Sequence, residues 1–160
     1  PDSMDAGEMY RRACVSRGRG VTRIMADYIQ DFRPMPGHKN DAEGISESMR
    51  MISRCATELG MLVILVSQID KATRQLDRQP TLNDAKGSSS ISDRTDMGIS
   101  VHRPFYNKKP EDAYVEVGSA ERRQMQDERN TVDFAIVKNK YGSMGSVRVK
   151  FDGKSMRYKR

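Results

Sequence analysis

The sequence is poor in cysteine, and its two cysteines, Cys14 and Cys55, belong to no CxxC pair and to no cluster with histidine. A zinc site is therefore not expected. Two cysteines beside eleven methionines fit a reducing compartment better than a secreted scaffold, which favours a cytoplasmic protein. No apolar run is long enough to span a bilayer, and no signal peptide is visible. The sequence thus argues against membrane-embedded and secreted classes.

Apolar residues make up 36% of the chain and charged residues 31%, so we expect a small interior and a highly charged surface. A length of 160 residues suits one domain. The 28 basic and 22 acidic residues leave a net charge of +6, which favours an anionic partner, most often nucleic acid. A basic protein without such a partner has the same composition, so charge alone leaves both interpretations open.

Hydrophobic periodicity in the first half of the chain predicts an α/β unit. Apolar residues recur at intervals of four and three between Glu43 and Leu59, which indicates a helix with one apolar stripe. The members of this stripe are Ile45, Met49, Ile52, Ala56 and Leu59. Gly60 ends the helix, and the apolar run Met61–Val66 predicts a strand buried on both faces of a parallel sheet. Further expected elements are a helix at 5–17, a strand at 21–29 and a loop at 33–40.

The second half of the chain predicts strands separated by long polar loops. Residues 71–92 form one such loop, and loops of this length are functional or disordered. Residues 107–130 form another. Strands are expected at 97–102, 131–137, 146–151 and 156–159, with a hairpin turn at 152–153. The predicted fold is α/β: a mostly parallel sheet with flanking helices that ends in an antiparallel hairpin.

Two predicted strands of the first half end in polar residues. Asp27 follows the apolar centre of the first, Ile24–Ala26, and Ser67 and Gln68 follow the second. Parallel strands bring their carboxyl ends to one edge of the sheet, where ligands bind in open α/β folds. A carboxylate there can hold Mg²⁺ through water, and an amide can hydrogen-bond a terminal phosphate. Taken alone, each residue is better explained as an ordinary strand end.

Two basic segments carry further candidates. The loop at 78–94 contains Lys86, Gly87 and several serines, which can bind a phosphate backbone through amides, hydroxyls and charge. Lys138 and Lys140 lie two residues apart at the end of a predicted strand. Cations placed in this way can reach the phosphates of a nucleotide on a neighbouring subunit. Composition alone favours a solvated loop in the first case and a basic strand end in the second.

The four segments, in this order, resemble the C-terminal part of the motor domain of DnaB-type replicative DNA helicases. The family has Asp-Tyr-Leu-Gln, Leu-Ser-Gln-Leu, Arg-Pro-x-Leu-Ser-Asp-Leu-Arg-Glu-Ser-Gly, Lys-Gln-Arg-Asn-Gly and Phe-Asp-Gly at the corresponding places. The matching segments here are Asp27–Gln30, Ser67–Gln68 after Glu58–Leu59, Arg78 with Pro80–Asp84, Lys138–Gly142 and Phe151–Gly153. The resemblance runs from the helix before Asp27 to Tyr158, nearly the whole chain.

The resemblance implies a RecA-like fold, with residues 1–160 as the C-terminal portion of one motor domain. It implies an enzyme that uses ATP and Mg²⁺ to translocate on single-stranded DNA and unwind duplex. Asp27 would be the carboxylate on the Mg²⁺ side, through water, and Gln68 the sensor of the terminal phosphate. Lys138 and Lys140 would reach the nucleotide of the neighbouring subunit in a homohexameric ring. The residues that would contact the single strand are Arg78, Lys86, Gly87 and Ser89. Primase or a helicase loader would be further partners.

The chain departs from the family at several positions. Lys140 stands where the family usually has arginine, and an ammonium cannot make the planar bidentate contact of a guanidinium, which weakens the expectation of trans activation. The segment 86–89, Lys-Gly-Ser-Ser, replaces Arg-Glu-Ser-Gly. These departures indicate a diverged member of the family, which acts in a bacterial cell and is encoded by a phage or mobile element. His38 and His102 have no evident catalytic partner.

The 160 residues contain no G-x-x-x-x-G-K-[ST] motif, whose amides and lysine hold ATP phosphates. The chain also begins at Pro1 in a polar stretch, which indicates a piece of a longer parent. We therefore expect the chain alone neither to hydrolyse ATP nor to unwind DNA. One alternative is a non-enzymatic, helicase-derived module that binds single-stranded DNA or a partner. Another is a recombinase or other RecA-like ATPase, which fits the closing Phe-Asp-Gly segment less well.

Overall fold

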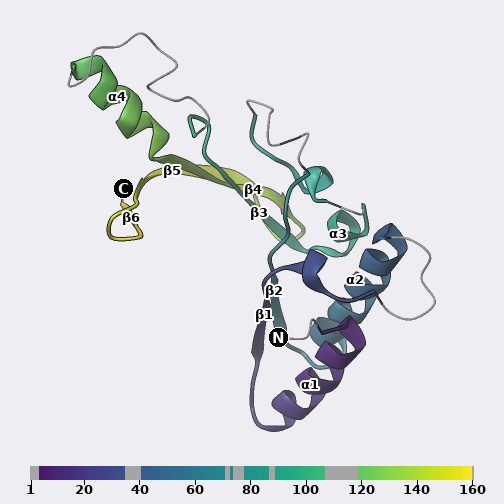
Figure 1. Cartoon of the computed structure of the whole chain (residues 1–160). Coiled ribbons are helices and arrows are strands. Elements are labelled where there is room, and N and C mark those ends of the chain that lie inside the picture. The colour runs from purple at the N-terminus through teal and green to yellow at the C-terminus, as the bar shows by residue number, and fades with distance from the viewer. Residues whose placement is uncertain are drawn as a thin grey trace. The chain divides into compact units, whose positions relative to one another are not determined.

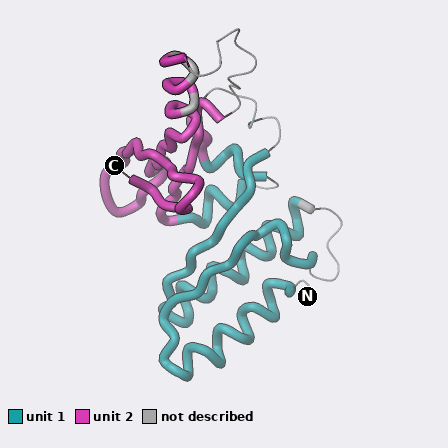
Figure 2. The backbone as a smooth tube through the Cα atoms, turned by 60° about the vertical axis from the view of Figure 1, so that its left-hand side comes forward, with its two compact units in different colours: residues 1–74, 82–95 teal, residues 75–81, 96–160 magenta. Residues whose placement is uncertain are grey.

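The structure, a computed structural model, describes residues 4–34, 41–70, 73, 78–86, 89–106 and 119–159. The chain divides into two compact units (Figure 2). Unit 1 comprises Pro1–Arg74 and Leu82–Thr95, and unit 2 comprises Gln75–Thr81 and Asp96–Arg160. Within the described ranges, no helix is long and apolar enough to cross a membrane. A parallel strand pair and an antiparallel sheet are both present, so the predicted α/β class is confirmed.

Unit 1 consists of a parallel strand pair and two long helices (Figure 1). β1 (Arg23–Ala26) pairs with β2 (Leu62–Leu65), with Ala26 opposite Leu65. α1 (Ala6–Gly18) and α2 (Asp41–Thr57) lie on one side of this pair, as Figure 1 shows. The shorter elements are η1 (Ile29–Asp31), η3 (Leu82–Asp84) and α3 (Ser89–Arg94).

Local sequence signals explain where the two long helices begin and end. Asp5 caps α1, because its carboxylate accepts a hydrogen bond of 2.8 Å from the Glu8 amide. Gly20 (φ 87°) and Gly60 (φ 59°) lie in the turns that follow α1 and α2, in a backbone conformation that other residues rarely adopt. The helices predicted from the sequence are thus confirmed, with bounds shifted by one or two residues.

The core of unit 1 lies between the helices and the inner face of the strand pair. Met9 of α1 packs in one cluster with Met49, Ile52 and Cys55 of α2. Cys55 is fully buried, whereas Ala56, which the sequence places in the apolar stripe, is exposed. At about 3.6 residues per turn, the next core position after Ile52 falls between residues 55 and 56, and in the structure Cys55 occupies it.

The outer face of the strand pair differs from the prediction. The strand at 61–66 is expected to be buried on both faces, yet Leu62 and Ile64 are 56% and 48% exposed, and Met25 on β1 is 66% exposed. Both long helices of unit 1 cover the opposite face and leave these side chains exposed. The prediction of burial on both faces is therefore wrong for the part of the chain that the structure describes.

Unit 2 is built on a four-stranded antiparallel sheet in the order β3-β4-β5-β6. The strands are β3 (Met97–His102), β4 (Thr131–Asn139), β5 (Gly145–Asp152) and β6 (Arg157–Lys159). The predicted strand at 97–102 and the closing hairpin of β5 and β6 are confirmed. The antiparallel part exceeds the single predicted hairpin, because β3 and β4 join the same sheet.

α4 (Ala120–Arg129) corrects the prediction of a loop at 107–130. Its sequence, Ala-Glu-Arg-Arg-Gln-Met-Gln-Asp-Glu-Arg, contains no glycine, proline or β-branched residue. Gln124 also donates a hydrogen bond of 3.2 Å to Glu128, one turn later. Strong helix propensity therefore outweighs the high charge of this segment. Residues 107–118 lie outside the described residues.

Candidate functional site

Two strand ends meet at one edge of unit 1. The parallel register of β1 and β2 brings Asp27 and Gln68 to this edge, as the sequence predicts. Backbone pairing continues past the strands, because the Val66 amide donates to the Ala26 carbonyl (2.9 Å) and the Ile29 amide donates to the Val66 carbonyl (3.0 Å). The edge is thus a continuation of the sheet, and the two side chains emerge from a fixed backbone.

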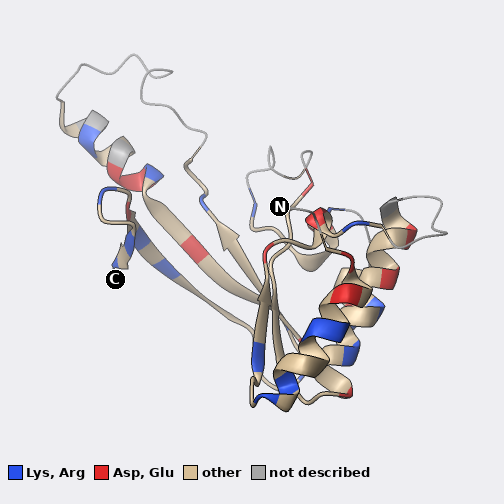
Figure 3. Cartoon of the chain, turned by 60° about the horizontal axis from the view of Figure 1, so that its bottom comes forward, with Lys and Arg blue, Asp and Glu red and all other residues tan. Residues whose placement is uncertain are grey.

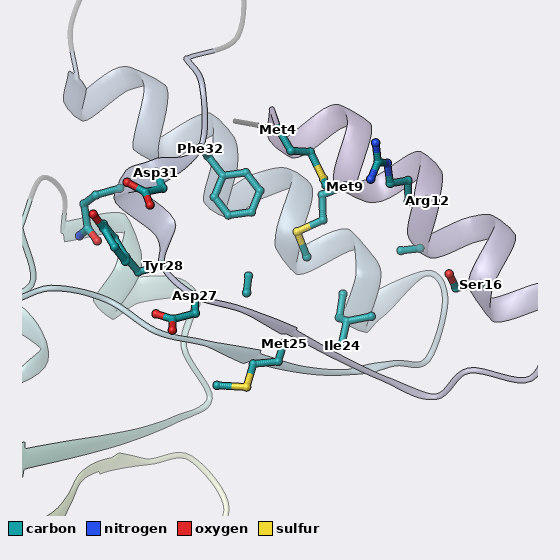
Figure 4. A pocket seen from close by; sticks show the side chains of 13 residues that line it. Met4, Met9, Arg12, Ser16, Ile24, Met25, Asp27, Tyr28, Asp31 and Phe32 are labelled. Carbon is teal, nitrogen blue, oxygen red and sulfur yellow. The ribbon is translucent and has the colours of Figure 1, made fainter. Parts of the chain in front are cut away.

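Tyr28 links this edge to η1. Its pKa is raised, chiefly because its hydroxyl is hydrogen-bonded to the Asp31 carboxylate, and a hydrogen bond with the Gln68 side chain acts in the opposite direction. Figure 4 shows Asp27, Tyr28 and Asp31 together at one end of an open groove. The groove has a volume of about 760 Å³ and is lined by residues of α1, β1 and η1. Asp27 therefore lies at an open groove, whereas Gln68 is not among the residues that line it.

The Gln30 carboxamide joins three segments of unit 1. Its Nε2 donates to the Ser67 hydroxyl (3.0 Å) and to the Lys86 carbonyl (2.8 Å). Its Oε1 accepts from the Gln68 amide (3.1 Å). The Lys86 amide in turn donates to the Gln68 carbonyl (2.8 Å). One side chain thus connects the end of β1, the end of β2 and the segment that carries Lys86.

The segment that carries Lys86 has a structured stem. Ile69 and Ala85 form an antiparallel bridge, and the Asp70 amide donates to the Asp84 carbonyl (2.9 Å). Ile91 of α3 is 3% exposed and belongs to the core of unit 1. The described parts of the predicted loop are therefore fixed on both sides of residues 87–88, which lie outside the described residues.

The predicted DNA-contacting residues are divided between the units. Lys86, exposed, and Ser89, the first residue of α3, belong to unit 1. Arg78 belongs to unit 2, where its Nη1 donates to the Gln79 carbonyl (3.3 Å). Gly87 lies outside the described residues. The structure thus places Lys86 and Ser89 in one unit and does not place Arg78 beside them.

Lys138 and Lys140 lie at the end of β4 in unit 2. Lys140 Nζ forms an ion pair with Asp96 Oδ1 (2.7 Å), and the Lys140 amide donates to the Asp96 carbonyl (3.0 Å). The hydrogen bond to Asp96 raises the pKa of Lys140. Sequence reasoning did not predict the pairing of Asp96 with Lys140, because only the pairing of β3 with β4 brings these two residues together over a separation of 44 residues.

A second group that sequence reasoning missed consists of arginines and aromatic rings in unit 2. The Arg103 guanidinium lies 4.4 Å from the centre of the Tyr106 ring and 5.6 Å from that of Phe151. Its Nη2 donates to the Arg129 carbonyl (2.9 Å). The buried Nε atoms of both arginines have no hydrogen-bond partner among the described residues. A guanidinium group stacked on aromatic rings can bind planar or anionic groups.

The strands of unit 2 carry many basic residues, but acidic residues lie among them (Figure 3). Arg148 forms a bidentate pair with Asp133 (2.6 and 2.8 Å). Lys150 is paired with Asp127, and Lys159 with Asp152 (3.0 Å). The hydrogen bond from Arg148 lowers the pKa of Asp133, and nearby His102 contributes in the same direction. His38 lies outside the described residues. The net positive charge therefore does not define a continuous cationic surface on this sheet.

Solved structures share this fold. One solved ATPase domain aligns with 98% of this chain and 51% of its own length, with a TM-score of 0.78 and 21% sequence identity. A DnaB-like replicative helicase, solved in a study of its interactions with primase, aligns with 98% of this chain and 35% of its own length (TM-score 0.77, 21% identity). The fold is therefore that of RecA-like helicase ATPase domains.

The model of the DnaB-like helicase C terminal domain matches residues 3–160, and the chain belongs to this family. The replicative DNA helicase DnaB of Haemophilus influenzae is 28% identical over 141 residues, which are 87% of this chain and 27% of the relative. The DnaB of Rickettsia bellii is 27% identical over 151 residues, with coverage of 90% and 30%. The chain thus spans less than a third of these relatives.

Proposed function

We propose that this chain is the C-terminal portion of the motor domain of an ATP-dependent replicative helicase that translocates on single-stranded DNA and unwinds duplex. The observation that supports the proposal is the parallel pairing of β1 and β2, after whose ends Asp27 and Gln68 follow at the same edge. Family membership supports it, because replicative helicases are among the relatives. Both units would belong to one motor, in a bacterial cytoplasm or encoded by a phage.

Asp27 fits a role beside Mg²⁺. Its carboxylate is exposed at the edge and supplies the hard oxygen that this ion prefers. The described residues contain no group of three or more histidine, cysteine, aspartate or glutamate side chains that could hold a metal. Asp27 would therefore act as one contact, through water, to an ion held mainly by nucleotide phosphates, which is the usual mode for Mg²⁺.

Gln68 would sense the terminal phosphate of ATP. Its backbone is held on both sides by hydrogen bonds, while its side chain contacts the Tyr28 hydroxyl. A side-chain amide can donate to a phosphate oxygen in exchange for that contact. Loss of the phosphate on hydrolysis would return the amide to Tyr28 and move the segment that follows. Lys86, Gly87, Ser89 and Arg78 would lie along the single strand.

Lys138 and Lys140 would reach a nucleotide bound to the neighbouring subunit of a homohexameric ring. Cations supplied in trans stabilise the charge that develops during phosphoryl transfer. The chain alone would not hydrolyse ATP, because its 160 residues contain no phosphate-gripping G-x-x-x-x-G-K-[ST] segment. Primase or a helicase loader would be further partners; the study of one structural neighbour concerns its interactions with primase.

A substitution at Asp27 tests the proposal. In the full-length protein, Asp27→Asn should reduce ATP turnover by roughly 10²-fold or more, because charge at the Mg²⁺ is lost. The thermal unfolding midpoint should stay unchanged, because the side chain is exposed. Asp127→Asn, on α4, is a matched control without an assigned role. Equal turnover in the two variants would contradict the proposal.

The second candidate function is a non-enzymatic module that binds single-stranded DNA or a partner protein. The net charge of +6 is compatible with it, because a basic protein favours an anionic partner with or without ATP hydrolysis. The coding sequence upstream of Pro1 distinguishes the two candidates: a strand followed by the missing motif supports the motor, and a stop codon or unrelated gene supports the module. A measured turnover by the purified 160-residue chain would contradict both.

A further inference from the structure

The backbone at Gln68 is held at two points. Its backbone N–H donates to Gln30 Oε1 (3.1 Å), and its backbone carbonyl accepts from the Lys86 backbone N–H (2.8 Å). The same Gln30 side chain donates to the Lys86 carbonyl (2.8 Å). Gln68, Gln30 and the backbone of Lys86 therefore form a closed ring of hydrogen bonds, in which no member can shift without stretching a bond to another.

The three members of this ring come from distant parts of the chain. Gln30 is 38 residues from Gln68 and 56 residues from Lys86. Gln30 lies in η1, the short helix that follows β1. Tyr28 precedes this helix, and Asp31 is its last residue. The ring therefore connects the strand end that carries Asp27 to the stem that carries Lys86.

We propose that Gln30 is a positioning residue that couples the nucleotide edge of unit 1 to the segment that carries Lys86. This inference rests on the proposed function, since it requires that nucleotide and DNA bind to these two places. A phosphate that draws the Gln68 side chain away from Tyr28 also displaces the Gln68 backbone. Gln30 transmits that displacement to the Lys86 carbonyl, and the position of the Lys86 side chain changes with the nucleotide.

The chemistry of the position requires a carboxamide of this length. Nε2 supplies the two donors and Oε1 the acceptor, so all three bonds use one planar group. Asparagine is one methylene shorter. Glutamate has no donor and would place a carboxylate against the Lys86 carbonyl. Methionine has similar length and volume but makes none of these bonds, so Gln30→Met removes the connection with little change in packing.

The test uses the full-length protein and a labelled single-stranded oligonucleotide. The dissociation constant is measured with a non-hydrolysable ATP analogue and with ADP, and the ratio of the two constants reports the coupling. Coupling between two sites typically gives a ratio of about 5 to 150. We expect such a ratio for the wild type and a ratio near 1 for Gln30→Met. Gln124→Met, an equal change at an exposed position of α4, should keep the wild-type ratio.

The outcomes separate the inference from the proposed function. A purely structural role of Gln30 would lower the unfolding temperature or weaken DNA binding with both nucleotides alike, and an unchanged ratio in Gln30→Met would overturn the inference alone. A wild-type ratio of 1, or no nucleotide binding, would overturn the proposed function as well. If Gln30→Met does not fold, Gln30→Asn, whose side chain is one methylene shorter and cannot reach both Gln68 and Lys86, should lower the ratio partway; a wild-type ratio there overturns the inference.

Discussion

Unit 1 and unit 2 hold their candidate residues by different means. In unit 1, neutral hydrogen bonds hold the Gln68 backbone: its N–H donates to Gln30 Oε1, and its carbonyl accepts from the Lys86 backbone N–H. In unit 2, the Lys140 ammonium is held by an exposed ion pair with Asp96, whose side chain is 55% exposed. Salt weakens exposed ion pairs but has little effect on neutral hydrogen bonds. The first arrangement is fixed, and the second can exchange its partner.

This difference agrees with the proposed roles. A sensor of the nucleotide in its own subunit gains from a backbone that is hydrogen-bonded to other segments, because a small displacement of the sensor is then passed on to those segments. A cation that acts on a neighbouring subunit must leave its resting partner. Asp96 is suited to that, since a single carboxylate competes poorly with the several charges of a nucleotide triphosphate.

The largest expected effect comes from removing the exchangeable cation. In the full-length protein, Lys140→Ala should reduce DNA-stimulated ATP turnover by about 10³-fold, the lower range for a trans cation. Nucleotide affinity should stay unchanged, because the residue would act only on the neighbour. Steady-state turnover and equilibrium nucleotide binding measure the two quantities.

Lys140→Arg is the matched control for this prediction, because it keeps the charge and supplies the residue that the family usually has. It should retain or raise turnover. Unaltered turnover in Lys140→Ala would exclude a trans role and remove the functional contrast between the two units.

A smaller effect is expected at the stem of unit 1. Lys86→Ala should reduce the slope of log affinity for single-stranded DNA against log salt concentration by about 0.7, the value for one lost phosphate contact. Binding titrations at several salt concentrations give this slope. Lys154→Ala, at the exposed turn between β5 and β6, serves as the comparison and should leave it unchanged. Equal slopes for Lys86→Ala and wild type would remove Lys86 from the DNA path.

The smallest effect concerns an ion pair that belongs to unit 1. Glu58 accepts hydrogen bonds from Arg54 (2.6 and 3.0 Å) and from the Tyr10 hydroxyl (2.5 Å). These bonds, with that from Arg54 the strongest, lower the pKa of Glu58 from its ordinary value of 4.5 to about 2. A folded-state pKa below the unfolded one stabilises the fold above pH 4.5, and this contribution is lost as the pH falls toward 2.

Glu58→Gln should therefore lower the unfolding temperature slightly at pH 7, and the difference from wild type should shrink as the pH falls below 4.5. Calorimetry across this pH range measures it, and the solvent exposure of the pair keeps the effect small. A difference that persists unchanged at pH 2 would show that the ionised pair is not its cause.

The elements that repeat with a clear period could be predicted from the sequence. The stripe from Ile45 to Leu59 indicated α2, and the polar residues after two apolar runs placed Asp27 and Gln68 at one edge. These predictions needed only local periodicity and the rule that parallel strands end together. The prediction that β2 is buried on both faces was wrong. A run of apolar residues shows a tendency to be buried, but it does not show whether a covering layer is present.

The contacts that complete the candidate site could not be predicted in this way. Gln30 has backbone partners at Gln68 and Lys86, and any residue type offers such groups, so no sequence pattern marks them. Asp96 meets Lys140 only through the register of β3 on β4. Such contacts depend on tertiary placement. The catalytic, metal and DNA roles of the site residues stay predictions.

The most direct test of the account is a structure of the full-length protein with Mg²⁺ and a non-hydrolysable ATP analogue. The account predicts that the Asp27 carboxylate lies one water molecule from the ion and that the Gln68 side chain lies within hydrogen-bonding distance of the terminal phosphate. A nucleotide bound elsewhere, with both side chains facing only solvent, would contradict it.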